Sequence, residues 1–251
     1  MAKDLFSKQS DLYARYRPHY PKELFDYIVS FVKNRDIAWD CATGNGQAAS
    51  VLADYFDQVI ATDISVAQIE KAIQKNNITY SVCPAESTTF ADNTFDLVTV
   101  AQAYHWIKWA DFRKEVIRVC KPGAIIAVWM YYNHNTHDEK VTAAVRNFHA
   151  TVTQPYWDHE RKYVEEKYET VEFDYPLLPV KNFESVTQWR LDDLIGYVNS
   201  WSAIQKFIKT NGYSPVPQLQ EELTKLWPAG EIKRVTFPIY LKLGRISKPG
   251  M

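Results

Sequence analysis

The sequence predicts an α/β fold with a mostly parallel sheet, and two observations carry this prediction. Short apolar runs recur in the first half of the chain, as expected of strands buried on both faces; they cover residues 37–40, 59–63, 80–83, 97–100 and 125–129. Segments with helical periodicity lie between most of them, at residues 47–56, 65–76 and 109–120. Alternating strands and helices favour right-handed crossovers and parallel pairing.

The loop after the first of these strands has the features of a ligand-binding turn. Residues 38–47 read AWDCATGNGQ, so Asp40 ends the strand, and Gly44 and Gly46 precede a helical pattern. Glycines allow a ligand to approach the backbone closely. A second acid, Asp63, ends the next run. Acids at the ends of neighbouring parallel strands suit a ligand with ribose hydroxyls.

The same loop also matches the loose dinucleotide fingerprint, as Gly44-x-Gly46-x-x-Ala49 with Asp63 downstream. Two details argue against a bound pyrophosphate: the strand ends before the first glycine, and an anion at this turn would face the Asp40 carboxylate. A cationic ligand has no such conflict. An NAD-dependent oxidoreductase that uses the same loop is therefore an alternative function.

The composition predicts an ordinary soluble protein. The chain has 251 residues, of which 46% are hydrophobic and 24% charged, and 29 basic residues balance 30 acidic ones. We expect no nucleic-acid partner, because the sequence has no basic run that would bind phosphates. Three isolated cysteines indicate a reducing compartment, and no apolar stretch is long enough for a membrane span. The expectation is a cytoplasmic monomer or weak homodimer with no membrane partner.

The pattern D-x-(G/A)-x-G-x-G, followed by a strand that ends in an acid, resembles motif I and the ribose-binding acid of class I S-adenosylmethionine-dependent methyltransferases. The resemblance implies a Rossmann-like fold with a seven-stranded sheet, S-adenosylmethionine as the cofactor, and a helical substrate lid. It also implies an antiparallel edge strand, which the period-two pattern at residues 232–243 fits. Ala42 stands where the family usually has its first glycine.

The N-terminal segment strengthens this resemblance. Residues 13–21 read YARYRPHYP, similar to the Y-x-x-x-RP-x-YP signature of a small-molecule branch, with a methyltransferase type 11 domain, that includes trans-aconitate methyltransferases. In that branch the tyrosine and arginine close over the cofactor, which implies this role for Tyr13, Tyr16 and Arg17. The alternative is a segment that only covers the edge of the sheet.

Two further segments follow the third and fourth predicted strands. Cys83-Pro84-Ala85-Glu86 is similar to the family's adenine-reading D-A-E step, and residues 101–106, AQAYHW, match its A-Q-A-x-HW segment beside the methionine part. The resemblance therefore implies this set of cofactor-binding residues: Tyr13, Tyr16, Arg17, Asp40, Ala42, Gly44, Gly46, Asp63, Ile64, Ala85, Glu86, Gln102 and Ala103.

The second half of the chain is expected to bind the substrate. We expect one methyltransferase domain over residues 1–251, in which residues 1–20 cover the cofactor and residues 131–203 form an inserted lid. Residues 184–203 resemble a helix pair of the same branch that lies beside the acceptor pocket. The expected substrate-binding residues are Trp106, Tyr131, Arg190, Tyr197 and Trp201.

Methyl transfer from a sulfonium is an in-line displacement, for which the protein mainly supplies alignment and a dry site. The resemblance to trans-aconitate methyltransferases suggests a carboxylate acceptor, which needs no base and which Arg190 would orient. A hydroxyl acceptor would need a base. His105 is the one histidine at a predicted strand end, so it is the candidate catalytic base or substrate contact. The alternative is a structural ring packed beside Trp106.

No metal site is expected. His134, His137 and Asp138 lie close together in the sequence, but neither turn chemistry nor a cysteine supports a metal there, and capping or solvated side chains explain them better. Besides the oxidoreductase, a non-catalytic protein that binds S-adenosylmethionine is the second alternative function.

Overall fold

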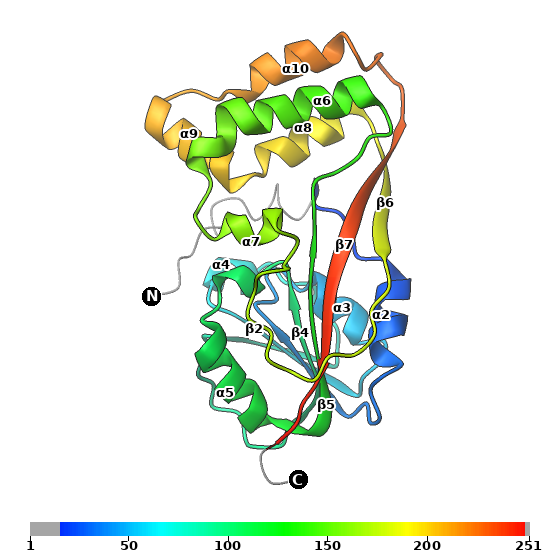
Figure 1. Cartoon of the computed structure of the whole chain (residues 1–251), viewed down its shortest axis with the longest axis vertical. Coiled ribbons are helices and arrows are strands. Elements are labelled where there is room, and N and C mark those ends of the chain that lie inside the picture. Colours follow the sequence, from blue (N-terminus) through cyan, green and yellow to red (C-terminus); the bar gives the residue numbers. More distant parts are fainter. Residues whose placement is uncertain (1–15, 249–251) are drawn as a thin grey trace.

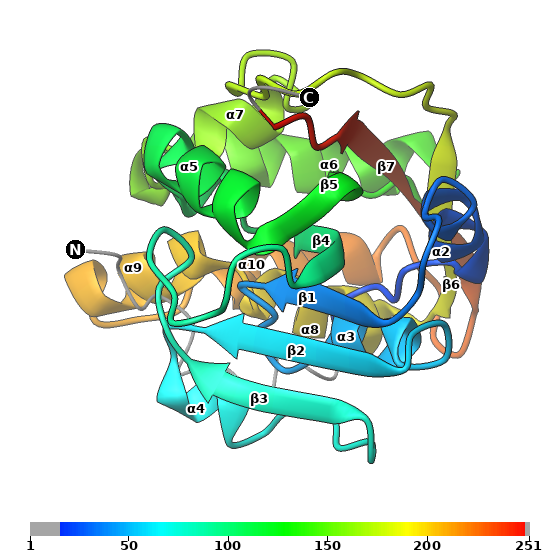
Figure 2. The same cartoon turned by 90° about the horizontal axis from the view of Figure 1, so that it is seen from below.

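The computed structural model describes residues 16–248, and these contain a seven-stranded sheet with the order β3-β2-β1-β4-β5-β7-β6. The strands are β1 (Ile37–Cys41), β2 (Gln58–Asp63), β3 (Ile78–Val82), β4 (Phe95–Ala101), β5 (Cys120–Tyr131), β6 (Phe183–Trp189) and β7 (Lys233–Arg245). The first five strands pair in parallel. Their carboxyl ends therefore share one edge, and the predicted Rossmann-like fold is confirmed (Figures 1 and 2).

The last two strands differ in position from the prediction. β7 is antiparallel as expected, but it lies between β5 and β6, so β6 occupies the edge. The prediction of a helix pair over residues 184–203 was wrong for its first half, because residues 183–189 form the strand β6. The side chains of β6 alternate between buried and exposed positions, which is the pattern of a strand with one solvated face.

Helices cover both faces of the sheet. They are α2 (Lys22–Val29), α3 (Gln47–Leu52), α4 (Val66–Ile69), α5 (Trp109–Val119), α6 (Glu139–Phe148), α7 (Arg161–Glu165), α8 (Leu191–Asn199), α9 (Ser202–Asn211) and α10 (Val216–Thr224), with short turns η2 (Tyr104–Trp106), η3 (His149–Thr153) and η4 (Gln154–Tyr156). Successive strand residues point to opposite faces: Ala38 packs with α2 and α3, whereas Trp39 packs with α5.

The capping residues explain where two helices begin. Ser65 accepts a hydrogen bond from the amide of Gln68 at 3.3 Å and is the N-cap of α4. Asp138 caps α6 in the same way, by accepting from the amides of Lys140 and Val141. The helix from residue 65 is shorter than predicted. The amide of Ile73 donates to the carbonyl of Asn45, at 3.0 Å, and ties the segment after α4 to the loop after β1.

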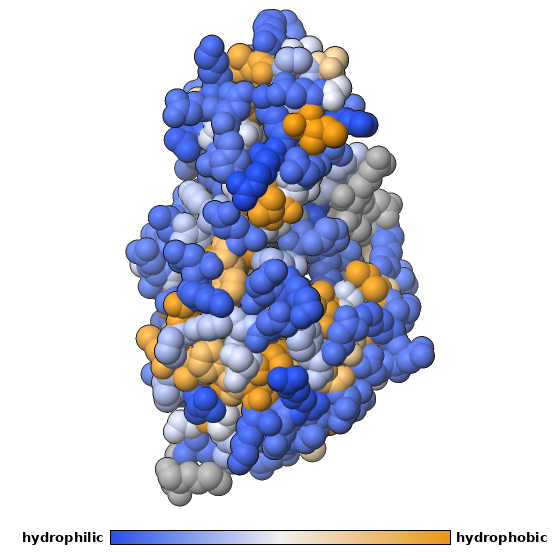
Figure 3. Space-filling view, turned by 90° about the vertical axis from the view of Figure 1, so that its right-hand side faces the viewer, coloured by the Kyte–Doolittle hydropathy of each residue, from blue (hydrophilic) through white to orange (hydrophobic). Residues whose placement is uncertain are grey.

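A cap of helices lies beyond the carboxyl ends of the strands. Figure 1 shows α6, α8, α9 and α10 packed together at the top of the molecule, with α7 between this cap and the α/β layer. The long β7 runs from the bottom of the molecule up to the cap. The face that carries β6 and α2 shows small apolar patches scattered among polar residues (Figure 3). Within residues 16–248, no helix combines the length and apolar character that a membrane span requires.

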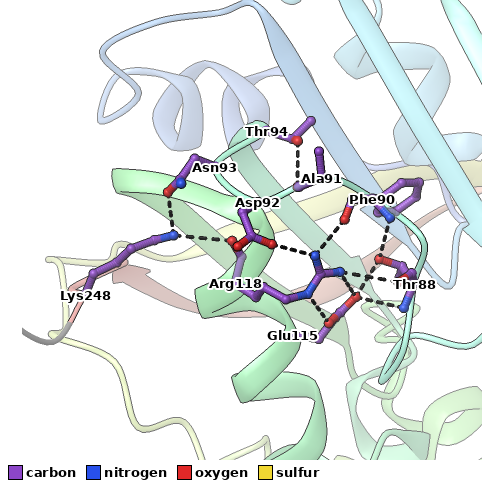
Figure 4. Close-up of polar contacts among 9 residues, drawn as sticks. All are labelled: Thr88, Phe90, Ala91, Asp92, Asn93, Thr94, Glu115, Arg118 and Lys248. Carbon is purple, nitrogen blue, oxygen red and sulfur yellow. Dashed lines mark hydrogen bonds and ion pairs between the residues drawn. The ribbon is translucent and has the colours of Figure 1, made fainter.

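An ion-pair network fixes the loop between β3 and β4 (Figure 4). Arg118 of α5 donates to the carboxylates of Glu115 and Asp92 at 2.7 and 2.8 Å, and to the carbonyl of Phe90 at 2.7 Å. Burial raises the pKa of Glu115, but hydrogen bonds from Arg118 and Thr88 outweigh burial and lower it overall. The network anchors the loop that follows the predicted adenine segment to α5.

Candidate functional site

Asp40 lies at the carboxyl end of β1 and holds the following loop from inside the protein. Its side chain is fully buried, and its two oxygens accept hydrogen bonds from the hydroxyls of Thr43 in the loop and Thr99 in β4. Burial raises the pKa of Asp40 to about 6, although both threonines and the amide of Ala49 lower it. The carboxylate therefore connects the loop, β4 and the start of α3.

Asp63 lies beside this loop at the end of β2. One of its oxygens accepts a hydrogen bond from the amide of Gly44 at 2.9 Å, and the other accepts from the amide of Ser65 at 2.8 Å. The next residue, Ile64, leaves 37% of its surface exposed. The structure thus brings the loop, an acid and an exposed apolar side chain together, as the sequence predicts for a nucleoside.

Two non-glycine residues at neighbouring strand ends have left-handed backbones. Ala42, after β1, has φ 53°, and Gln102, after β4, has φ 59°. Such conformations cost free energy and concentrate at functional sites. The side-chain amide of Gln102 accepts from the amide of Tyr131 at 3.1 Å and donates to its carbonyl at 3.4 Å. These bonds fasten the segment after β4 to the end of β5.

Gly46 is required at its position for two separate reasons. Its backbone has φ 83°, and an added Cβ atom would lie 2.3 Å from the Tyr80 hydroxyl oxygen. That hydroxyl donates to the carbonyl of Ile73 at 2.5 Å, so Tyr80 is held over the glycine. Gly44 is different, because the nearest heavy atom to an added Cβ is Gln68 Oε1 at 4.0 Å. The loop is thus packed on one side and open on the other.

The other predicted cofactor residues lie near the same edge of the sheet or outside the described residues. Ala85 is buried, and Glu86 accepts from the amide of Lys108 at 3.0 Å. Ala103 immediately precedes η2. The ring of Tyr16 lies against α8, where a Cβ on Gly196 would be 2.5 Å from it. Tyr13 lies outside residues 16–248.

A pocket lies between these strand ends and the helical cap, and it is partly open, with about 710 Å³ of empty space when the solvent at its mouth is included. Seven predicted residues line it: Arg17, Gln102, His105, Trp106, Tyr131, Tyr197 and Trp201. They come from four separate parts of the chain. The pocket is also lined by seven residues that the sequence did not predict: Tyr132, Asn133, Trp157, Asp158, Arg161, Val164 and Ser202.

Arg17 joins the N-terminal segment to the cap and to the sheet. Its guanidinium donates to the hydroxyl of Tyr131 at 3.0 Å and to the carbonyl of Ser200 at 3.1 Å, and it lies 5.5 Å from the centre of the Tyr197 ring. Tyr197 is buried, and burial raises its pKa to about 12. Arg17 is therefore a positive charge at the wall of the pocket.

His105 is neutral in this pocket. Burial and, to a smaller extent, the charge of Arg161 lower the pKa of His105 to about 3. Its Nδ1 lies 2.7 Å from the Tyr168 hydroxyl. Burial raises the pKa of the Tyr168 hydroxyl, so the hydroxyl stays protonated, and we assign its proton to the bond with Nδ1. The histidine proton is then on Nε2, and this nitrogen donates rather than accepts.

Arg161, on α7, is the charged residue that sequence reasoning missed. Its guanidinium lies 4.4 Å from the centre of the Trp157 ring, and Trp157 in turn stacks on His149 with ring centres 5.5 Å apart. Arg161 lies deep in the fold, and burial lowers its pKa. It nevertheless keeps part of its surface accessible, because it faces the pocket.

Arg190 does not line this pocket. It is an exposed residue at the N-terminus of α8, and its amide donates to Asp193 at 2.8 Å. The sequence offered no periodic signal for Arg161, because residues 149–165 form one π-turn, one 3₁₀ turn and a helix of five residues. Among residues 16–248, no cluster of histidine, cysteine or acidic side chains has the makings of a metal site.

Comparisons with known proteins agree with this geometry. A family model described as a methyltransferase domain matches residues 39–128. A Dictyostelium discoideum protein named as a methyltransferase is 32% identical over 250 residues, which cover 96% of this chain and 95% of the relative. A solved structure from Anaeromyxobacter dehalogenans, described as a type II methyltransferase, is 35% identical with a TM-score of 0.85, over 92% of this chain and 99% of that one.

A more distant structure shares the fold alone. The Bacillus halodurans protein, also described as a methyltransferase, is 19% identical with a TM-score of 0.52, over 90% of this chain and 98% of that one.

Proposed function

The chain belongs to the S-adenosylmethionine-dependent methyltransferases with a methyltransferase domain, and we propose that it methylates a small molecule that carries a carboxylate. Because the chain belongs to a family of methyltransferases, neither the NAD-dependent oxidoreductase nor the non-catalytic binding protein is retained. The observation that carries the proposal is the pocket between the strand ends and the cap, which has two arginines in its wall. Arginine is suited to bind carboxylates through paired hydrogen bonds.

The residues at the strand ends fit the cofactor. Among residues 16–248, nothing lies closer than 4.0 Å to a Cβ added at Gly44, the Asp63 carboxylate lies beside this loop, and Ile64 offers an exposed apolar surface, which supports a nucleoside here. We assign the cofactor to these residues, together with Ala42, Ala85, Glu86, Gln102 and Ala103 and with the N-terminal Tyr13, Tyr16 and Arg17. When bound, S-adenosylmethionine supplies a methyl group on a positively charged sulfur, which keeps the electron pair of the broken bond.

The protein's own residues then align the acceptor and exclude water. The pocket is lined by aromatic rings, including Trp106, Trp157 and Trp201, which bury a small planar body and favour a dry site. His105 is a weak base because its pKa is low and its Nδ1 is occupied. We assign it the role of a hydrogen-bond donor to the acceptor through Nε2. The acceptor then attacks in line with no covalent intermediate on the protein.

Isotope transfer from labelled S-adenosylmethionine tests this function. Organic acids are compared with the corresponding amides and alcohols, and label is expected in acids. Thermal melting provides an independent measurement, since S-adenosylhomocysteine should raise the melting temperature by mass action, whereas NAD should not. Label in neutral compounds alone would contradict the carboxylate assignment, and no stabilisation by S-adenosylhomocysteine would contradict the cofactor site.

The affinity for S-adenosylmethionine is expected to fall as the pH is lowered below about 6. Burial raises the pKa of Asp40 to about 6, so the carboxyl is protonated in acid. A positively charged ligand beside the loop favours the ionised form, and binding in acid must then release a proton. The affinity should fall by up to about tenfold per pH unit below the pKa. Calorimetric titration between about pH 5 and pH 8 measures this dependence.

Asp40→Asn is the matched control, because its side chain keeps a hydrogen-bonding shape but has no charge to lose. Its affinity should be weaker than that of the parent at neutral pH and should change less with pH. If the parent binds S-adenosylmethionine with the same affinity at both ends of this pH range, the charge of Asp40 does not contribute to binding.

A further inference from the structure

The position of Arg161 raises the question of which part of the acceptor it binds, and the argument depends on the proposed function. Among residues 16–248, no carboxylate lies within ion-pair distance of Arg161, and no group accepts a hydrogen bond from its guanidinium. The neighbouring acid of the pocket, Asp158, pairs with Lys206 at 2.6 Å instead. Glu165 acts on Arg161 only through long-range attraction.

A deeply placed guanidinium without a partner is costly, because it has lost water and gained no compensating charge. The stack on Trp157 holds the guanidinium by its face and uses none of its N–H groups. Arg17 adds a second positive charge in the same pocket. This geometry is typical of a site in which the ligand supplies the negative charge. A carboxylate is the ligand group that fits the Arg161 guanidinium.

Electrostatics separates an anchoring carboxylate from a reacting one. A carboxylate that accepts a methyl group loses its negative charge, and part of that charge is already lost in the transition state. A guanidinium paired to it would stabilise the reactant more than the transition state and would slow the reaction. A carboxylate that stays ionised is bound equally well throughout and carries no such cost.

The arrangement of the pocket fits an anchor. Arg161 enters from α7, which lies between the helical cap and the α/β layer (Figure 1). Gln102, at the end of β4, lines the same pocket from the sheet. A ligand in the pocket can therefore contact both Arg161 and the end of β4.

We propose that Arg161 holds a carboxylate of the acceptor that stays ionised, and that the methyl group goes to a second nucleophilic group of the same molecule. The lone pair of that group forms the new bond to the methyl carbon, and the electron pair of the broken S–C bond stays on sulfur. A proton carried by the nucleophile becomes acidic once the bond has formed and leaves to solvent at the open side of the pocket. The substrate class is therefore a small acid with a separate amine or thiol.

The test uses labelled S-adenosylmethionine and three matched sets of compounds: acids that carry a second nucleophile, their methyl esters, and simple acids such as benzoate and cinnamate. Label should enter the first set in alkali-stable methyl groups and should be absent from the esters. An alkali-labile methyl ester of benzoate or cinnamate would overturn the proposal. Label confined to neutral compounds would instead overturn the proposed function itself.

Variants then test Arg161 on the acid that takes the most label. Arg161→Leu should raise the KM for this acid by at least about tenfold and change kcat by less than about threefold, which is the pattern of uniform binding. Arg161→Lys keeps the positive charge and should recover part of the affinity for the acid. Such a recovery shows that the higher KM of Arg161→Leu does not come from misfolding. Lys162→Leu removes a positive charge from the same helix outside the pocket and should leave KM unchanged. An unchanged KM in Arg161→Leu, or a raised kcat, would overturn the proposal.

Discussion

Gly46→Ala is expected to weaken the binding of S-adenosylhomocysteine by at least about 100-fold, equivalent to about 2.7 kcal/mol. The backbone at Gly46 has φ 83°, and a Cβ atom would lie 2.3 Å from the Tyr80 hydroxyl oxygen. Tyr80 has no easy way to move, because this hydroxyl donates to the carbonyl of Ile73. The loop after β1 must therefore shift, and the shift displaces the amides that face the cofactor. Calorimetric titration measures the loss.

Gly123→Ala is the matched control for this variant. Gly123 has φ 80°, but no atom lies within 4 Å of an added Cβ. The left-handed backbone then costs stability, on the order of 1–2 kcal/mol, without a steric conflict and away from the strand ends. The control should melt at a lower temperature and bind S-adenosylhomocysteine normally. If Gly46→Ala binds as tightly as Gly123→Ala, the loop does not form the cofactor site.

The parallel part of the fold could be predicted because its signals are local. Each of the first five strands is an apolar run with a polar or glycine-containing segment after it, and strand ends on one sheet edge follow from parallel pairing. For this reason the sequence indicated the loop after β1, Asp63 and the segment after β4. Ser65 was identifiable as a helix cap, since a cap depends on residues two or three positions away, whereas the cap at Asp138 was not predicted.

The sequence did not predict β6 as a strand, because half of its side chains are exposed and its pairing partner, β7, follows more than 40 residues later. Arg161 was missed for a related reason. Its partners in the pocket come from the N-terminus, from the ends of β4 and β5 and from α8, and nothing within its own short helix indicates them. Arg190 seemed equally suitable from the sequence, since only the tertiary packing separates an exposed arginine at the start of α8 from one in the pocket.

Asp63→Ala is expected to weaken cofactor binding by about 1.5–3 kcal/mol, the loss of a charge-assisted hydrogen bond. The structure adds a second effect. Asp63 also accepts hydrogen bonds from the amides of Gly44 and Ser65, at 2.9 and 2.8 Å. Alanine therefore removes the hydrogen bonds that hold the loop as well as the contact with the ribose. Asp63→Asn keeps one acceptor oxygen without the charge.

Comparison of the two variants separates these effects, because the loop contributes to stability and the ribose contact only to binding. If the carboxylate binds the ribose, Asp63→Asn, which can accept from only one of the two amides, should melt between Asp63→Ala and the parent and still lose most of the affinity for S-adenosylhomocysteine. If Asp63 only holds the loop in place, Asp63→Asn should bind S-adenosylhomocysteine nearly as well as the parent. The loss of affinity should then appear in Asp63→Ala, together with a lower melting temperature. Calorimetric titration and thermal melting of both variants distinguish the two outcomes, and a parent-like affinity in Asp63→Ala would contradict the ribose assignment.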